Sequence, residues 1–216
     1  MGTKFSTRVW VSVVGIASIF FGSKGYADTV ISVADFGLKP DTRENAVAYV
    51  QKAIEACRGK EPVTLVFPEG RYDFWPQYAH EKNYYETNTY DVFPKRLAML
   101  FEGLHNITVD GNGSQFVMHD RIQPITVENC DGVTLKNFSI DWDIPLTAQA
   151  RVTKVGSDFF EIEINVLESP YIIEDGKLVF VGEGWKSALG SMIEFESDTH
   201  FVVPGTCLLY TSDAAD

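Results

Sequence analysis

An internal repeat of 26 residues constrains the fold of this chain more than any other feature. The run LFEGLHNITVDGN (100–112) aligns with TVENCDGVTLKNF (126–138), so that matched positions lie 26 residues apart. The matches are Phe101 with Val127, Glu102 with Glu128, Ile107 with Val133, Thr108 with Thr134 and Val109 with Leu135. A period in the twenties is typical of one coil of a solenoid, in which each repeat buries its apolar face against its neighbours. The repeat therefore predicts a stack of β-strand rungs in which these residues fall on one another.

The segment before the repeat contains one predicted helix between two predicted strands. The run DTVISVADFG (28–37) alternates like a strand, and VTLVFPEGRY (63–72) is a strand that ends at Pro68 and Gly70. Between them, residues 39–59 place Val47, Val50 and Ile54 on one helical stripe, which Ala46, Ala53 and Cys57 widen. We expect Asp41 or Thr42 to cap this helix, with Glu44 completing a capping box, and Gly59 to end it.

The pattern changes after residue 145. The run ARVTKVGSDFFEIEINV (150–166) indicates two strands around the turn Gly156-Ser157-Asp158. KLVFVG (177–182), SMIEFES (191–197) and residues 200–203 continue as predicted strands. This half of the chain is therefore predicted to be an antiparallel β region inserted into the solenoid.

Both ends of the chain differ from the rest. Residues 1–27 have a basic start (Lys4, Arg8), a short apolar run (9–21) and the small-x-small ending Gly25-Tyr26-Ala27, which together predict a secretory signal peptide. Residues 207–216, CLLYTSDAAD, match the translation of a transposase adapter used in DNA library preparation, so we interpret them as a non-native scar. The expected organisation is a signal peptide (1–27), the cap and first rungs (28–145), a truncated antiparallel insertion (146–206) and the scar (207–216).

Charge narrows the classes of partner. The net charge of the full chain is −12. Without the predicted signal peptide (Lys4, Arg8, Lys24) and the scar (Asp213, Asp216), the net charge of the rest is −13. An acidic surface argues against nucleic acid and weakly against anionic polysaccharides, whereas neutral sugars remain open. Cys57 and Cys130 could form a disulfide in an exported protein or could be two small buried side chains.

The run FSIDWD (138–143) holds the first candidate site residues. If Phe138, Ile140 and Trp142 point inward, Asp141 and Asp143 point outward together, about 7 Å apart along the strand. Inverting glycosidases hold two carboxyl groups about 6.5–9.5 Å apart, so the spacing permits a catalytic pair, while a solvated outer face fits equally well. We expect these aspartates to bind substrate rather than to transfer protons.

Two further clusters stand out. Residues 71–94 are polar yet rich in aromatic rings, whose faces can carry sugar rings or can pack against the solenoid wall. Trp75 is the candidate substrate-binding residue of this loop. His119-Asp120-Arg121 is interpreted as a salt bridge plus a turn. The sequence has no zinc spacing, phosphate-binding glycine loop or nucleophile elbow, and no metal or other cofactor is expected.

The front of the chain resembles the N-terminal cap of the pectin-lyase-like right-handed parallel β-helix. The resemblance rests on a set of positions in the predicted helix and its two flanking strands: Asp35-Phe36-Gly37, Asp41, Asn45-Ala46, Gln51, Ala53-Ile54, Pro68, Gly70 and Tyr72. It implies an all-β fold, a right-handed parallel β-helix, in which an amphipathic helix plugs the open end of the coil.

More specific motifs resemble glycoside hydrolase family 110. They are DVFPKR (91–96), LFEGLHNITVDGNGS (100–114) and NFSIDWDIPLTAQARV (137–152). The resemblance covers residues 30–203 and implies an exported bacterial exo-α-1,3-galactosidase, inverting and metal-independent, acting on blood-group-B-type glycans. The catalytic aspartates are expected beyond this fragment, whereas Asp141, Trp142, Asp143 and Trp75 are expected to bind substrate.

Two other classes remain open. One is another β-helix enzyme, a polygalacturonase or polysaccharide lyase, and the other is a non-catalytic glycan-binding β-helix. We expect a carbohydrate partner, no nucleic acid, no membrane span after signal cleavage, and a periplasmic or extracellular location. The oligomeric state is left open.

Overall fold

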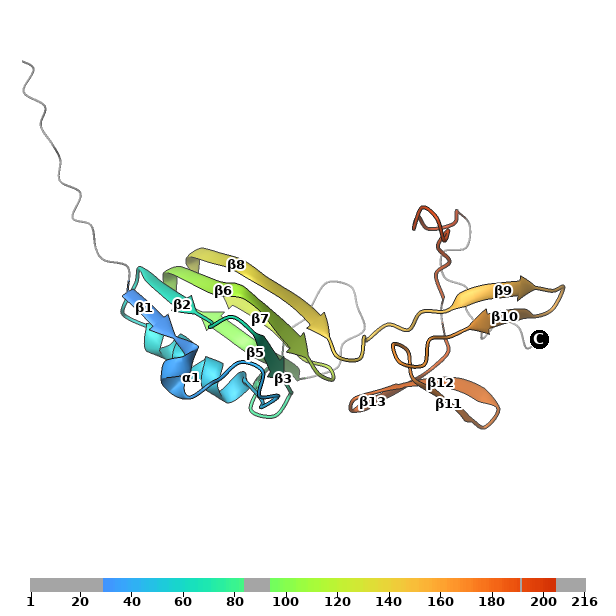
Figure 1. The fold of residues 1–216 in the computed structure, drawn as a ribbon, viewed down its shortest axis with the longest axis horizontal. Coiled ribbons are helices and arrows are strands. Elements are labelled where there is room, and N and C mark those ends of the chain that lie inside the picture. Colours follow the sequence, from blue (N-terminus) through green and yellow to red (C-terminus); the bar gives the residue numbers. More distant parts are fainter. Residues whose placement is uncertain (1–28, 84–93, 191, 205–216) are drawn as a thin grey trace, which may run out of the picture.

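The computed structural model describes residues 29–83, 94–190 and 192–204. Within these ranges the chain is mostly β, with the helix α1 and mainly parallel strands in its first half and antiparallel strands in its second half (Figure 1). The first half comprises β1 (Thr29–Ser32), the 3-10 helix η1 (Val33–Phe36), α1 (Val47–Cys57), β2 (Val63–Val66), β3 (Arg71–Phe74), β4 (His80–Lys82), β5 (Lys95–Glu102), β6 (His105–Met118), β7 (Gln123–Glu128) and β8 (Asp131–Trp142). The second half comprises β9 (Arg151–Val155), β10 (Phe160–Glu163), β11 (Tyr171–Glu174), β12 (Lys177–Gly182) and β13 (Trp185–Ala188).

The larger parallel sheet is built around the long strand β6. Strand β2 pairs with the first part of β6 and β3 with its last part, so that β2 and β3 follow one another along the same edge. Strand β8 pairs with the other edge of β6, and β1 pairs with β2. All of these pairings are parallel, which brings the carboxyl ends of β3, β6 and β8 to one end of the sheet.

The 26-residue repeat is confirmed as strand pairing. In the smaller sheet, β5 and β7 are parallel and place Phe101 opposite Val127 and Glu102 opposite Glu128. In the larger sheet, β6 and β8 pair all three remaining matches of the repeat, beginning with Ile107 opposite Val133. The described residues hold one such step in each sheet, which shows parallel pairing but does not show a closed solenoid.

The core lies where the two sheets and α1 meet. It takes Leu65, Phe74 and Phe116 from the larger sheet, Met99 and Phe101 from the smaller one, and the stripe Val47, Val50 and Ile54 from α1. The predicted helical stripe is therefore confirmed, because all six of its members are buried. Aromatic side chains contact one another within the core. The ring centroids of Phe67 and Phe116 are 4.7 Å apart, and those of Phe116 and Phe138 are also 4.7 Å apart.

The predicted start of the helix is wrong. Helix α1 begins at Val47, and its first free amide is bound by the Asn45 side chain, whose Oδ1 accepts from the Val47 N–H at 3.1 Å. Asp41 does not cap the helix because its carboxylate instead accepts from the backbone N–H of Arg71 at 2.9 Å. The chain between them turns sharply, with Asp41 and Arg43 both at positive φ.

The second half is antiparallel, as predicted, but it is thinly packed. Strands β9 and β10 form the expected hairpin, and β12 pairs with both β11 and β13. The described residues of 191–197 and 200–203 do not form the continuous strands that were predicted, and an isolated bridge joins Phe195 and Val202. In the described residues after 145, only Ser169 and Val179 are buried.

Several expectations concern residues outside the described ranges. The signal peptide, the adapter-derived scar and the tyrosines of the aromatic loop at 84, 85 and 90 all lie there. The predicted domain boundaries stay predictions. In the part of the chain that the structure describes, no helix is long and apolar enough to cross a membrane.

Cys57 and Cys130 are both free thiols, so they do not form a disulfide. Cys57 is buried on α1, as the second alternative expected, whereas Cys130 is only partly buried. Burial raises the pKa of the Cys57 thiol to about 11, so it stays protonated and unreactive at neutral pH.

Candidate functional site

Three strands of the larger sheet end in a cluster of polar side chains. Phe74, Met118 and Trp142 are register partners, and the next residue of each strand is Trp75, His119 or Asp143. The ladder continues through them, because the N–H of His119 donates to Phe74 O at 2.9 Å and that of Asp143 to Met118 O at 3.0 Å. Since side chains alternate along a strand and Phe74 and Met118 are in the core, the residues that follow them face outward.

Asp73 is the buried anion of this cluster. The residue is 1% exposed, and its carboxylate accepts from Arg71 Nη2 at 2.6 Å and from His119 Nε2 at 2.9 Å. Burial acts to raise the pKa of Asp73, but the hydrogen bonds from Arg71 and His119 and the charge of Arg43 outweigh burial and lower it. Asp73 is therefore held as a carboxylate at neutral pH.

Arg71 joins Asp73 to the predicted site residue Asp143. Its Nη2 atom lies 2.7 Å from Asp143 Oδ1, and Arg43 Nη1 lies 3.6 Å from both carboxylates. The hydrogen bond to Asp73 is the largest of the contacts that raise the pKa of Arg71.

The same cluster has the geometry of a metal site. One potential ligand atom from each of Asp73, His119 and Asp143 lies within 4.8 Å of the others. Two guanidinium groups already balance these carboxylates, and a cation added beside Arg71 would be repelled. The arrangement therefore fits an ion-paired scaffold better than a metal centre.

His119 connects the two halves of the described chain. Its Nδ1 atom lies 2.7 Å from Glu183 Oε2, in the turn between β12 and β13. Its ring stacks on Trp75 with centroids 3.8 Å apart and planes 11° apart. Gly184 allows the close approach of this turn, because it has φ +71° and any Cβ there would clash with the Asp120 carboxylate.

A pocket of about 470 Å³ opens beside the cluster. Its walls come from the loop after β3, from β4 and β5, from the bend after β6 and from the β12–β13 turn: Trp75, Pro76, Gln77, Tyr78, Ala79, Glu81, Arg96, Asp120, Glu183 and Gly184. Aromatic rings beside a few charged groups are typical of sites that bind small polar ligands.

The structure brings together two of the four predicted site residues. Trp75 and Asp143 both belong to the cluster at the strand ends, and Trp75 also lines the pocket. Trp142 packs against the core, and its indole N–H donates to Asp120 O at 3.3 Å. Asp141 is exposed on the outer face, where its carboxylate accepts from the N–H of Trp142. A role for these four residues in substrate binding stays a prediction.

Sequence reasoning missed Arg71, Asp73 and Glu183. A signal for the first two was present, because Arg71 and Asp73 alternate with Tyr72 and Phe74 in RYDF. The turn predicted for 119–121 is confirmed, since Asp120 has φ 56° and its carbonyl accepts from the N–H of Ile122 at 3.2 Å. The predicted salt bridge stays a prediction, because the His119 contact is with Asp73, outside this tripeptide. No local pattern indicates Glu183, which lies 64 residues from His119 in the sequence.

Comparison with known families first identifies the class of the antiparallel half. Residues 148–214 match the family described as GLAA-B beta-barrel domain I. The match runs through positions 207–214, which we interpreted as part of the scar, and that interpretation stays a prediction.

Comparison with known proteins then gives relatives that align with most of the chain. It is 60% identical over 180 residues to alpha-1,3-galactosidase B of Bacteroides thetaiotaomicron, an alignment that covers 83% of this chain and 29% of that protein. It is 36% identical over 169 residues to alpha-1,3-galactosidase A of Shewanella woodyi, covering 77% of this chain and 28% of that protein. It is 35% identical over 206 residues to alpha-1,3-galactosidase B of Phocaeicola vulgatus, covering 94% of this chain and 33% of that protein.

The chain is thus a homologue of the alpha-1,3-galactosidases A and B, which are glycosidases. It spans about a third or less of the length of these relatives.

Proposed function

We propose that this chain is the N-terminal part of an exported enzyme that removes terminal α-1,3-linked galactose from glycans, with inversion at the anomeric carbon. The single observation that carries the proposal is the 60% identity to an alpha-1,3-galactosidase B across 83% of the chain. Blood-group-B-type glycans, which end in this linkage, are the proposed natural substrates.

The same proposal includes the fold. The steps from β5 to β7 and from β6 to β8 have the same offset of 26 residues, and α1 covers the apolar side chains of the first strands. These features support a right-handed parallel β-helix whose first rungs are β5–β8 and whose cap is α1. The antiparallel strands β9–β13 would then be a β-barrel domain inserted between rungs.

Inverting hydrolysis requires one protonated carboxyl group to donate to the glycosidic oxygen and one carboxylate to activate water. Asp73 is poorly suited to be the acid, because its contacts lower its pKa and both of its neighbours Arg71 and His119 occupy its oxygens. Asp143 Oδ1 is also in an ion pair with Arg71, at 2.7 Å. We therefore assign this cluster to shaping the sugar-binding face, and we assign the acid and base to later residues of the full-length protein.

The test is an assay of the full-length protein that contains this chain. We expect it to release galactose from a terminal α-1,3-linked disaccharide but not from the α-1,4-linked isomer. Proton NMR of the first product should show β-galactose, since inversion converts an α-linkage into a β-product. Activity should survive a chelator.

Other results would overturn the proposal. No release of galactose from any α-1,3-linked substrate would refute it. Cleavage of pectate, or loss of activity with a chelator, would instead favour a polysaccharide lyase or polygalacturonase. Export has its own test. If the signal peptide is removed as predicted, N-terminal sequencing of the secreted protein should begin at Asp28.

A further inference from the structure

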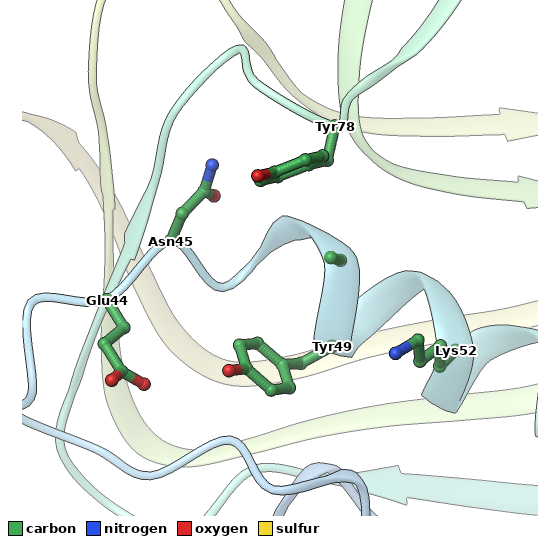
Figure 2. A pocket seen from close by; sticks show the side chains of 6 residues that line it. Glu44, Asn45, Tyr49, Lys52 and Tyr78 are labelled. Atoms are coloured by element: carbon green, nitrogen blue, oxygen red, sulfur yellow. The ribbon is translucent and has the colours of Figure 1, made fainter.

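A short loop after β3 contributes residues to two pockets. Residues 75–79 line the larger pocket described above, and Tyr78 also lines a second pocket of about 390 Å³. The second pocket lies over the start of α1 and is lined by Glu44, Asn45, Ala48, Tyr49, Lys52 and Tyr78 (Figure 2). Tyr78 is thus the one residue shared by both sets of lining residues.

The backbone of Tyr78 is held in an unfavourable conformation. Its φ is 69°, in the left-handed region that bulky side chains rarely adopt, and its residue surface is 74% exposed. Two side chains, one on α1 and one just before it, bind the backbone of this loop: Gln51 Nε2 donates to Tyr78 O at 2.8 Å, and Asn45 Nδ2 donates to Gln77 O at 3.0 Å. Backbone strain that the surroundings maintain concentrates at ligand-binding positions.

The side chains of the second pocket retain free hydrogen-bonding capacity. Among the described residues, the hydroxyls of Tyr49 and Tyr78, the Glu44 carboxylate and the Lys52 ammonium have no polar partner. The polar groups at the strand ends differ, because Asp73, Arg71 and His119 bind one another. In Figure 2 the rings of Tyr49 and Tyr78 both extend toward the side of the pocket where Glu44 and Asn45 lie.

These features select the chemistry of a ligand. The charges of Glu44 and Lys52 cancel, so the pocket does not favour an ion of either sign. Two aromatic rings offer apolar faces, while hydroxyl, carboxylate and ammonium groups offer hydrogen bonds to a ligand rich in hydroxyl groups. A neutral pyranose ring has both properties.

We propose that Tyr78 is an aromatic platform for a neutral sugar residue of the glycan, bound in the pocket over α1 by Glu44, Tyr49 and Lys52. This inference rests on the proposed function, because it adds a sugar-binding subsite to the same enzyme. The subsite would recognise a sugar that is not itself cleaved, so it contributes to binding of long substrates.

The experiment uses the full-length protein and a neutral trisaccharide that ends in α-1,3-linked galactose. Tyr78→Asn removes the ring and keeps a residue that tolerates positive φ, so the fold is preserved. We expect it to raise both the calorimetric Kd and the KM about fivefold, as for loss of one aromatic contact, with kcat changed less than about twofold. Tyr78→Phe, which retains the ring, should restore affinity to within about twofold of the parent protein.

Phe201→Asn is the matched control, because Phe201 is 73% exposed and lines neither pocket. It should leave Kd and KM unchanged. Equal Kd values for the parent protein and Tyr78→Asn, or no binding of the trisaccharide by the parent, would overturn the subsite. If the parent binds the trisaccharide without cleaving it and Tyr78→Asn weakens binding, the subsite stands and the proposed galactosidase activity fails.

Discussion

At the scale of the residue, Asp73 shows how a charge is kept inside this protein. Its side chain is fully buried, yet Arg71 and His119 donate hydrogen bonds to it and Arg43 adds positive charge. A buried charge left without partners is costly, so the cluster depends on all of its members.

Replacing Asp73 with alanine should therefore destabilise the protein strongly. We expect the free energy of unfolding to fall by about 3 kcal/mol, because Arg71 and His119 lose their shared acceptor. Chemical denaturation measures the free energy of unfolding of each variant. Asp141→Ala is the control, since Asp141 is exposed on the same outer face and should cost less than about 0.5 kcal/mol. Equal losses for the two variants would contradict the assignment.

The lowered pKa of Asp73 makes part of the stability depend on pH. A carboxyl whose pKa is lower in the folded state stabilises the fold above its unfolded pKa of about 3.9. This contribution is lost as pH falls through the folded value. Thermal melts of the parent and of Asp73→Asn should differ most near pH 6, and the difference should shrink below about pH 4. A constant difference down to pH 2.5 would show that Asp73 does not titrate as described.

At the scale of the element, the smaller sheet places two negative charges opposite one another and neutralises them with a lysine. Glu102 and Glu128 are opposite one another on β5 and β7, which is unfavourable for two carboxylates. Lys82 on β4 lies 2.7 Å from each of them. Its hydrogen bond to Glu102, followed by that to Glu128, raises the pKa of Lys82, and the same contact lowers the pKa of Glu102.

Lys82→Met should lower the melting temperature by about 1–2 °C at low salt, because it leaves the two glutamates facing each other. The loss should shrink in 1 M NaCl, since salt screens exposed charges. Lys186→Met is the matched control, because among the described residues Lys186 forms an ion pair with a single carboxylate, that of Glu174, at 3.2 Å. A Lys186→Met effect as large as that of Lys82→Met would argue against the stacked-acid explanation.

At the scale of the whole molecule, the antiparallel half depends on contacts with the parallel half. It buries only Ser169 and Val179 among its described residues, and Phe159, Leu167 and Ile173 are exposed. The contact between Glu183 and His119 connects the β12–β13 turn to the end of β6. Because a region with few buried contacts opens readily, this anchor should control its local stability.

Glu183→Ala should increase amide hydrogen exchange in residues 177–188 and leave 95–128 unchanged. Mass spectrometry of peptic fragments measures both regions in one experiment. Glu174→Ala provides the comparison, since Glu174 belongs to the same three-stranded sheet and, in the part of the chain that the structure describes, forms an ion pair only with Lys186. Unchanged exchange in 177–188 would show that Glu183 does not anchor this sheet.

Residue spacing alone predicted the register of the strands. The five matches of the repeat became five facing pairs, because side chains that stack on neighbouring rungs share the same environment. The apolar stripe of α1 was predictable for the same reason, since a period of 3.6 residues puts its members on one face. The helix start was not, because Asp41 binds Arg71 across 30 residues of chain.

The candidate site was decided by the tertiary structure. The repeat loses its period beyond Asp110, where the pairing of β6 with β8 shifts, so the 26-residue offset could not align His119 with Asp143. Asp73, His119 and Glu183 are 46 and 64 residues apart and share no local motif. Periodic burial is a property of neighbouring residues and is therefore visible in the sequence. A cluster of charges is formed by strand ends that meet only after the chain has folded, so only the tertiary structure reveals it.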